Sequence, residues 1–297
     1  MTFSLLARDS ATGQLGVAAQ SHYLGVGSVV TWAEAGVGVV ATQAFAARSY
    51  GPRGLALMRA RTPADAALAA LIEQDSDPEI RQVAFLDTSG DFAVHNGDRC
   101  VGAAGVAHGE YAVALGNMLD NTEVPDAMLR GFDEADGELA HRLVAGLLAG
   151  DQAGGDIRGR QSAALLVVDG GRTDTPWDGI VRDLRVEDHP DPVAELARLI
   201  NLNDAFDLVS QVVFDPAGAI LGDHGSGSEN QFRSAAAALV DAGLVLGDNP
   251  EATFWSAVLH ARHGRHTDAD RLLGEATRHN PRLPRFMAAL RAAGILI

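Results

Sequence analysis

The sequence predicts a mixed α/β fold with two β-sheets between layers of helices, followed by a small all-α region. Two observations predict it. The expected elements come in blocks of strands, two helices, strands, two helices and strands, which suits two sheets between helix layers better than strict alternation does. Beyond residue 222 the chain is rich in Ala and Leu with helical spacing. We therefore expect two domains, residues 1–222 and 223–297.

Three strands are expected within the first 45 residues. Thr2–Ala7 is rich in apolar residues and is followed by the turn formers Asp9–Gly13. Gly16–Gln20 predicts the second strand. Gly36–Ala41 predicts the third, and its small and β-branched residues are typical of a strand that is buried on both faces.

The rest of the first domain alternates between paired helices and groups of strands. Helical spacing predicts two consecutive helices within Gly54–Glu73, the second restarting at Pro63 after a Thr62 N-cap. The later expected elements are a strand hairpin (Gln82–Asp87 and Asp91–His95), a strand (Tyr111–Gly116), a helical stretch (Pro125–Gly150), two strands (Gln161–Asp169 and Val181–Val186) and a helix (Pro192–Leu202).

The composition changes at Gly222–Ser228, whose Gly and Ser content is typical of a flexible linker. The helical region beyond it contains residues spaced as in the second half of a tetratricopeptide repeat, namely Gly264, Ala269, Leu273, Ala276 and Pro281. Thr253 and His260 occupy the positions where such a repeat carries Trp and Tyr. One repeat cannot bury its own apolar face, so we expect this region to dock on the main domain or on a second chain.

Charge and composition exclude several function classes. The 23 basic residues, all Arg, and 39 acidic residues give a net charge of −16, which argues against a nucleic-acid or anionic membrane partner. The absence of Lys excludes Schiff-base chemistry, and a single cysteine, Cys100, excludes an internal disulfide framework or a Cys-rich zinc site. Without a long apolar run or a signal-like N-terminus, we expect a cytoplasmic protein with no cofactor and no metal.

Thr2 is the first candidate for a catalytic residue. Removal of Met1 would leave a hydroxyl and a free α-amine on one residue. A Thr hydroxyl is a weak nucleophile until a base lies beside it, and an α-amine with an ordinary pKa of about 8 can be that base. Because the chain has no Lys, this amine is its only aliphatic amine. A structural interpretation, in which Thr2 merely starts a strand, stays open beside the catalytic one.

The expected hairpin places polar residues opposite Thr2. If its turn centres near Ala11, Thr2 faces Gln20, with Ser21 and His22 just beyond. These three side chains are candidates to hold the amine, orient the hydroxyl or bind substrate. The spacing does not choose among them, and a strand running into a loop would show the same residues.

Several motifs occur together and in order along the first two thirds of the chain: Thr2–Asp9, Gly16–Ser21, Val26–Val30, Trp32–Ala33, Ala41–Ala44, Ser49–Gly54, Gly116–Leu119, Ala153–Asp156, Arg158–Ala164 and His189–Pro192. Over about residues 2–202 the chain resembles domain-of-unknown-function family 1028, which belongs to the superfamily of N-terminal-nucleophile (Ntn) hydrolases. The resemblance implies a four-layer αββα sandwich, as in proteasome β-subunits and penicillin acylases, and hydrolysis of an amide bond.

This chemistry requires further groups around the nucleophile. Asn117 follows the expected strand that ends at Gly116, and Gln43 lies at the end of the third expected strand. Both are candidate donors to an oxyanion; the alternatives are a turn Asn that satisfies local backbone and a polar strand end. Asp156 is a candidate anchor for the α-amine, and Arg160 for a substrate carboxylate; an Asp–Arg pair within their loop is the structural alternative. Proteasome-type sites use a Lys, so here activation would rest on the amine, an Arg or hydrogen bonds.

The function expected from these residues is hydrolysis of a small amide, with Thr2 as nucleophile after Met1 is removed. An anionic substrate is a hypothesis that depends on Arg160. The alternative is a non-catalytic scaffold of the same fold, in which Met1 stays and the helical tail mediates assembly or partner binding. We also expect a homo-oligomer.

Overall fold

The computed structural model describes residues 2–222 and 229–295. The chain divides into two compact units, Met1–Arg198 and Leu199–Ile297. Met1 and residues 223–228 of the predicted linker lie outside the described residues.

The first unit contains two sheets in which all neighbouring strands are antiparallel. The six-stranded sheet has the spatial order β10 (Ile180–Val186), β9 (Ser162–Val168), β2 (Leu15–Ser21), β1 (Thr2–Arg8), β8 (Ala112–Leu119) and β7 (Ala103–His108). The four-stranded sheet has the order β3 (Thr31–Glu34), β4 (Gly38–Ala44), β5 (Arg81–Asp87) and β6 (Phe92–Asn96). β1, which carries Thr2, is thus an interior strand.

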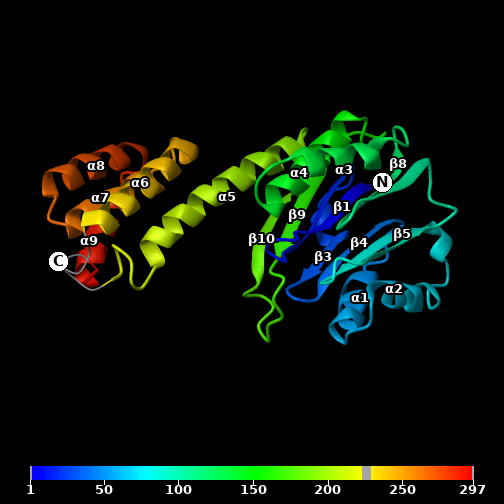
Figure 1. The fold of residues 1–297 in the computed structure, drawn as a ribbon. Coiled ribbons are helices and arrows are strands. Elements are labelled where there is room, and N and C mark those ends of the chain that lie inside the picture. Colours follow the sequence, from blue (N-terminus) through cyan, green and yellow to red (C-terminus); the bar gives the residue numbers. More distant parts are fainter. Residues whose placement is uncertain (1, 223–228, 296–297) are drawn as a thin grey trace. The chain divides into compact units, whose positions relative to one another are not determined.

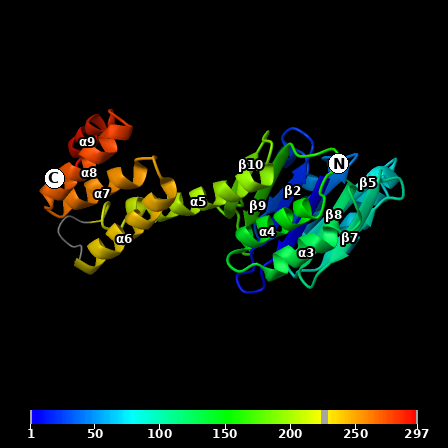
Figure 2. The ribbon, with the colours of Figure 1, turned by 90° about the horizontal axis from the view of Figure 1, so that it is seen from above.

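Helices cover the outer face of each sheet (Figure 1). α3 (Val124–Glu134) and α4 (Leu139–Gln152) pack on the six-stranded sheet, and Figure 2 shows them lying across it. α1 (Tyr50–Arg59) and α2 (Ala64–Ile72) pack on the four-stranded sheet. The inner faces meet in an apolar core that includes Leu6, Val17, Val39, Leu86 and Leu115, all fully buried. The predicted mixed α/β class with two sheets is confirmed.

Some element boundaries differ from the prediction. β3 and β7 were not expected as strands: β3 is four residues long, and β7 is a half-exposed edge strand without clear alternation. α1 begins at Tyr50 rather than Gly54, because Gly51 lets the first turn approach the Trp32 ring; a Cβ there would lie 2.2 Å from it. α5 (Pro192–Phe214) extends twelve residues beyond the predicted end at Leu202.

The register of the first hairpin corrects the prediction by one residue. Phe3, not Thr2, pairs with Gln20. The six-residue connection between Arg8 and Leu15 is centred between Ala11 and Thr12, half a residue later than expected. Because neighbouring side chains point to opposite faces of a sheet, Gln20 lies with Phe3 on the side of α4, whereas Thr2 faces the second sheet.

The second unit consists of helices, which confirms the predicted C-terminal helical region. α6 (Glu229–Leu246), α7 (Glu251–Arg262), α8 (His266–His279) and α9 (Leu283–Ala292) each contact the next along the chain (Figure 2). Their core includes Leu239, Phe254, Leu259 and Ala276, together with Val209 from the last part of α5. Within the described residues, no helix is long and apolar enough to cross a membrane.

A polar cluster joins α1, the end of α2 and the start of β5. The Asp75 carboxylate accepts hydrogen bonds from Tyr50 Oη and Arg81 Nε, each at 3.0 Å. Arg81 Nη1 also donates to the carbonyl oxygen of Phe45, in the loop after β4, at 2.5 Å. The hydrogen bond from Arg81 is the main cause that lowers the pKa of Asp75 to about 2. This cluster therefore fixes the loop that follows β4.

We predict that Asp75→Asn lowers the free energy of unfolding at neutral pH by about 1–3 kcal/mol, the range for a hydrogen bond to a charged group. A carboxylate whose pKa is depressed by folding contributes stability above its unfolded value, and the contribution is lost as pH falls through the folded value. Wild type and Asp75→Asn should therefore converge in denaturant unfolding as pH falls from about 4 to 2. Replacement of the exposed Glu73 by Gln is the control, and a constant difference across this range would contradict the assignment.

Candidate active site

Thr2 lies at the start of β1 with its side chain turned toward the four-stranded sheet. The residue is 5% exposed, and its hydroxyl donates a hydrogen bond to Ser21 Oγ at 3.1 Å. Ser21 is the last residue of the neighbouring strand β2 and is fully buried. The corrected register is what brings these two hydroxyls together.

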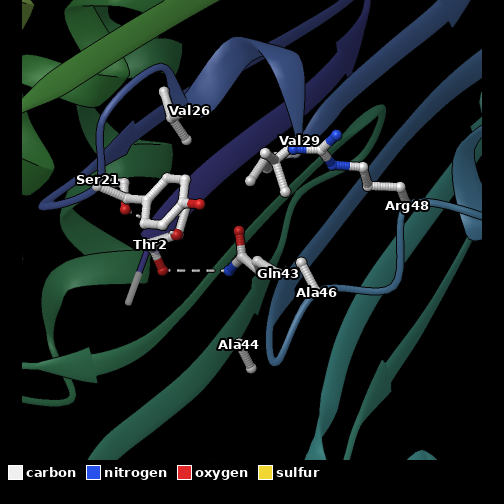
Figure 3. A pocket seen from close by; sticks show the side chains of 10 residues that line it. Thr2, Ser21, Val26, Val29, Gln43, Ala44, Ala46 and Arg48 are labelled. Atoms are coloured by element: carbon white, nitrogen blue, oxygen red, sulfur yellow. Dashed lines mark hydrogen bonds between the residues drawn. The ribbon is translucent and has the colours of Figure 1, made fainter. Parts of the chain in front are cut away.

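A cavity of about 260 Å³ opens beside Thr2. Its described lining residues come from β1, β2, the segment from β2 through the short helix η1 (Val26–Ser28) to the residues just after it, the end of β4 and the segment after β4. They are Thr2, Ser21, Tyr23, Val26, Val29, Val30, Gln43, Ala44, Ala46 and Arg48. Figure 3 shows Thr2 and Ser21 on one side of this cavity, Arg48 on the opposite side and Gln43 between them. A cavity of this size suits a small molecule.

Two buried side-chain amides hold the backbone of Thr2. Gln43 Nε2 donates to the Thr2 carbonyl oxygen at 3.2 Å, the bond drawn in Figure 3, and Asn117 Nδ2 donates to the same oxygen at 3.4 Å. Both amides also donate to Gln82 Oε1, at 2.7 and 3.0 Å. Thr2 and Asn117 are paired in register across β1 and β8. The position of Thr2 therefore depends on residues from both sheets.

The network continues beyond these three amides. Gln82 Nε2 donates to Asn96 Oδ1 at 2.6 Å, and Ser4 Oγ donates to Gln43 Oε1 at 2.6 Å. Gln43, Gln82 and Asn96 are register partners across β4, β5 and β6. Each neutral hydrogen bond of this kind contributes about 1 kcal/mol net, and losing one partner costs more because the other is left buried.

Two residues beside the network have left-handed backbones. Ala44, directly after Gln43, has φ 64°, and Met118, directly after Asn117, has φ 46°. A side chain with a Cβ adopts this region at a cost of order 1 kcal/mol, and such strain persists only where surrounding contacts enforce it. Here the strain occurs next to both amides that bind the Thr2 carbonyl.

The predicted site residues separate into groups. Thr2, Ser21 and Gln43 line the cavity, and Asn117 lies behind them in the network. Asn117 Oδ1 is buried and has no hydrogen-bond partner among the described residues.

Asp156 and His22 lie in a second group that connects loops. The buried Asp156 carboxylate accepts the backbone N–H of His22 at 2.9 Å and that of Arg158 at 2.9 Å. Its Oδ2 also lies 3.3 Å from the Arg158 guanidinium. This arrangement ties the segment after β2 to the segment after α4, as in the structural alternative considered for Asp156.

Arg160 and Gln20 lie apart from the described cavity lining. Arg160 Nη2 is 2.7 Å from Asp151 Oδ2, and this pairing raises the pKa of the guanidinium. Gln20 is fully buried on the helix side of the sheet, and its amide has no partner within the part of the chain that the structure describes.

Arg48 and Gln82 are the residues of this region that sequence reasoning missed. Arg48 lines the cavity and is exposed, and its side chain makes no hydrogen bond or ion pair within residues 2–222 and 229–295. The sequence feature that could have indicated Arg48 is its position five residues after Gln43, the polar residue at the end of a strand. Gln82 was included in a predicted strand, but only the pairing of β4 with β5 shows that it reaches the first sheet.

The cavity combines a buried hydroxyl, amide donors, aliphatic walls and one guanidinium, which together can hold a small polar molecule against Thr2. No group of three or more metal-ligating side chains was found among the described residues.

The comparisons with known proteins point in one direction. A crystal structure of the protein SPO2555 from Silicibacter pomeroyi, itself assigned to DUF1028, matches with a TM-score of 0.60 and 32% sequence identity, over 67% of this chain and 87% of that chain. None of the curated proteins matches. The model of DUF1028, a family of unknown function, matches residues 2–196. The chain therefore belongs to the DUF1028 family.

Proposed function

We propose that the protein is an N-terminal-nucleophile hydrolase that cleaves a small amide, with Thr2 as nucleophile once Met1 has been removed. The observation that carries the proposal is the setting of Thr2: its hydroxyl lies at a cavity on Ser21 Oγ, and its carbonyl is held by two buried amides. A residue that merely starts a strand has no need of amide bonds from two sheets.

The layers support the same assignment. Two antiparallel sheets packed face to face, with α1 and α2 outside one and α3 and α4 outside the other, fit an αββα sandwich of the Ntn type. In such a sandwich the nucleophile begins an interior strand, as Thr2 begins β1.

The proposed first step forms a tetrahedral oxyanion on Thr2. Thr2 Oγ attacks the amide carbonyl carbon, the π pair moves to the carbonyl oxygen, and the hydroxyl proton passes to the α-amine of Thr2. Ser21 Oγ orients the hydroxyl beforehand. Gln43 Nε2 stabilises the oxyanion, exchanging its 3.4 Å bond to the Leu115 carbonyl for a stronger bond to a charged oxygen while it keeps its 3.2 Å bond to the Thr2 carbonyl.

The second step releases both products. The oxyanion pair re-forms the carbonyl, the C–N bond breaks, and the leaving nitrogen takes the proton from the α-ammonium. Water then attacks the Thr2 ester, giving one proton to the amine, and collapse returns that proton to Thr2 Oγ with release of the acid. Asn117, whose Oδ1 has no hydrogen-bond partner among residues 2–222 and 229–295, accepts a hydrogen bond from the α-amine and so positions it.

We also propose that α7 and α8 form a tetratricopeptide-like pair. The two helices contact each other, the turn between them contains Gly264 with φ 69°, and Ala269 and Ala276 are buried at the small-residue positions of the pattern. Trp255 and Phe254 lie in the core of this unit, although not at the expected aromatic positions.

The first prediction concerns Met1 and Thr2. Intact-mass measurement should show that Met1 is absent, and incubation with a β-lactone should add the mass of one lactone, because ring opening acylates Thr2. Thr2→Ser should still be labelled and Thr2→Ala should not. Retention of Met1 would leave the amine blocked and favour the scaffold alternative.

Two controls make this labelling specific. Ser10→Ala removes an exposed hydroxyl from the turn between β1 and β2, outside the cavity lining, so the variant should still be labelled. Peptide mapping distinguishes Thr2 from Cys100, whose thiol has its pKa raised by burial and should react slowly. Labelling that persists in Thr2→Ala would place the chemistry elsewhere.

The second prediction concerns Ser21. Because Ser21 Oγ accepts the hydrogen bond that orients the Thr2 hydroxyl, Ser21→Ala should slow lactone labelling about 5- to 10-fold, as expected for a neutral hydrogen bond of about 1 kcal/mol. Ser28→Ala, an exposed position in η1, is the matched control and should label at the wild-type rate. Equal rates for both variants would remove Ser21 from the mechanism.

A further inference from the structure

The cavity beside Thr2 is lined by both apolar and polar side chains. Val26, Val29 and Val30 form an aliphatic wall, and Ala44 and Ala46 add small apolar groups. Apolar walls of this kind favour a short hydrocarbon portion of a ligand over a charged or strongly hydrated one.

Arg48 differs in charge from the other lining side chains, which are either apolar or, as in Thr2, Ser21, Tyr23 and Gln43, polar and uncharged. It is the one charged side chain among the described lining residues, and it lies across the cavity from Thr2 (Figure 3). Neighbouring arginines are engaged: Arg53 donates to Gln74, and Arg81 binds Asp75. Arg48 has no such acceptor within the described residues, so its guanidinium is available to a ligand.

A guanidinium binds a carboxylate through two parallel hydrogen bonds, which fixes both the distance and the orientation of the anion. The net charge of −16 repels anions at long range, so an anionic ligand must be held by a contact at short range. Arg48 provides that contact, and the cavity volume of about 260 Å³ limits the ligand to a small molecule.

From these observations we infer that the cavity takes a small aliphatic amide carrying one carboxylate, with the carboxylate on Arg48 and the amide carbonyl at Thr2. The hydrolysis of this amide rests on the proposed function, whereas the binding of its carboxylate to Arg48 does not. The carboxylate can belong to the amine side, as in an N-acyl amino acid, or to the acyl side, as in a dicarboxylic acid monoamide.

The test compares charged and neutral amides on the full chain. The probes are N-acetylglycine and N-acetylvaline, with the carboxylate on the amine side, and succinamate, with the carboxylate on the acyl side. Each is paired with its methyl ester, and release of amine or ammonia is followed. We expect Arg48→Met to raise KM for the preferred acid about 10- to 100-fold, with a small change in kcat and little effect on its ester. Arg53→Met, an exposed position outside the cavity lining, is the control and should behave as wild type.

A second measurement separates this inference from the proposed function. Binding of the same acids to Thr2→Ala, measured by calorimetry, should be weakened to the same extent by adding Arg48→Met. Binding that depends on Arg48 without hydrolysis in wild type would overturn the proposed function and support the carboxylate site. Hydrolysis of acids and esters with equal KM, unaffected by Arg48→Met, would overturn the carboxylate site alone. Absence of both binding and hydrolysis would overturn both.

Discussion

The carbonyl oxygen of Thr2 is the point on which the candidate site depends. Two amides, Gln43 from the four-stranded sheet and Asn117 from the six-stranded sheet, donate to this one atom, and both also bind Gln82. Beyond this polar network, which also includes the bonds from Ser4 to Gln43 and from Gln82 to the Gly116 carbonyl, the sheets meet in non-directional apolar packing, which fixes their spacing but not their register at the ends of the strands. The hydrogen bonds of the amides are directional and therefore fix how the strand ends of the two sheets align.

Most strands and helices of the first unit could be predicted from the sequence, because the strands are buried and the turns between them contain Gly, Asp and Ser. The exceptions have physical causes. β7 is a half-exposed edge strand, so its pattern is weak, and α1 starts early because Gly51 packs on Trp32, a contact between residues far apart in sequence. Tertiary contacts of this kind leave no local signal.

The candidate site was only half predictable. Thr2, Ser21, Gln43 and Asn117 were found as polar residues at strand ends, but a half-residue shift of the turn moved Gln20 to the opposite face. Nothing in the sequence distinguishes Arg160 from an arginine whose side chain is available to a substrate. Only the fold shows that its guanidinium is paired with the Asp151 carboxylate. Charge pairing across a loop depends on geometry that spacing does not contain, and the network partner Gln82 was hidden for the same reason.

The amide network around Thr2 does not change its charge with pH. Gln43, Gln82, Asn117, Asn96 and Ser4 have no ionisable group between them, so the framework around Thr2 keeps one protonation state from acid to alkaline solution. The Asp75 carboxylate, in the cluster that holds the loop after β4, has its pKa lowered to about 2, chiefly by the hydrogen bond from Arg81. Under the proposed function, the pH dependence of the rate would therefore report the titration of the reacting groups and not that of the amide network that holds them.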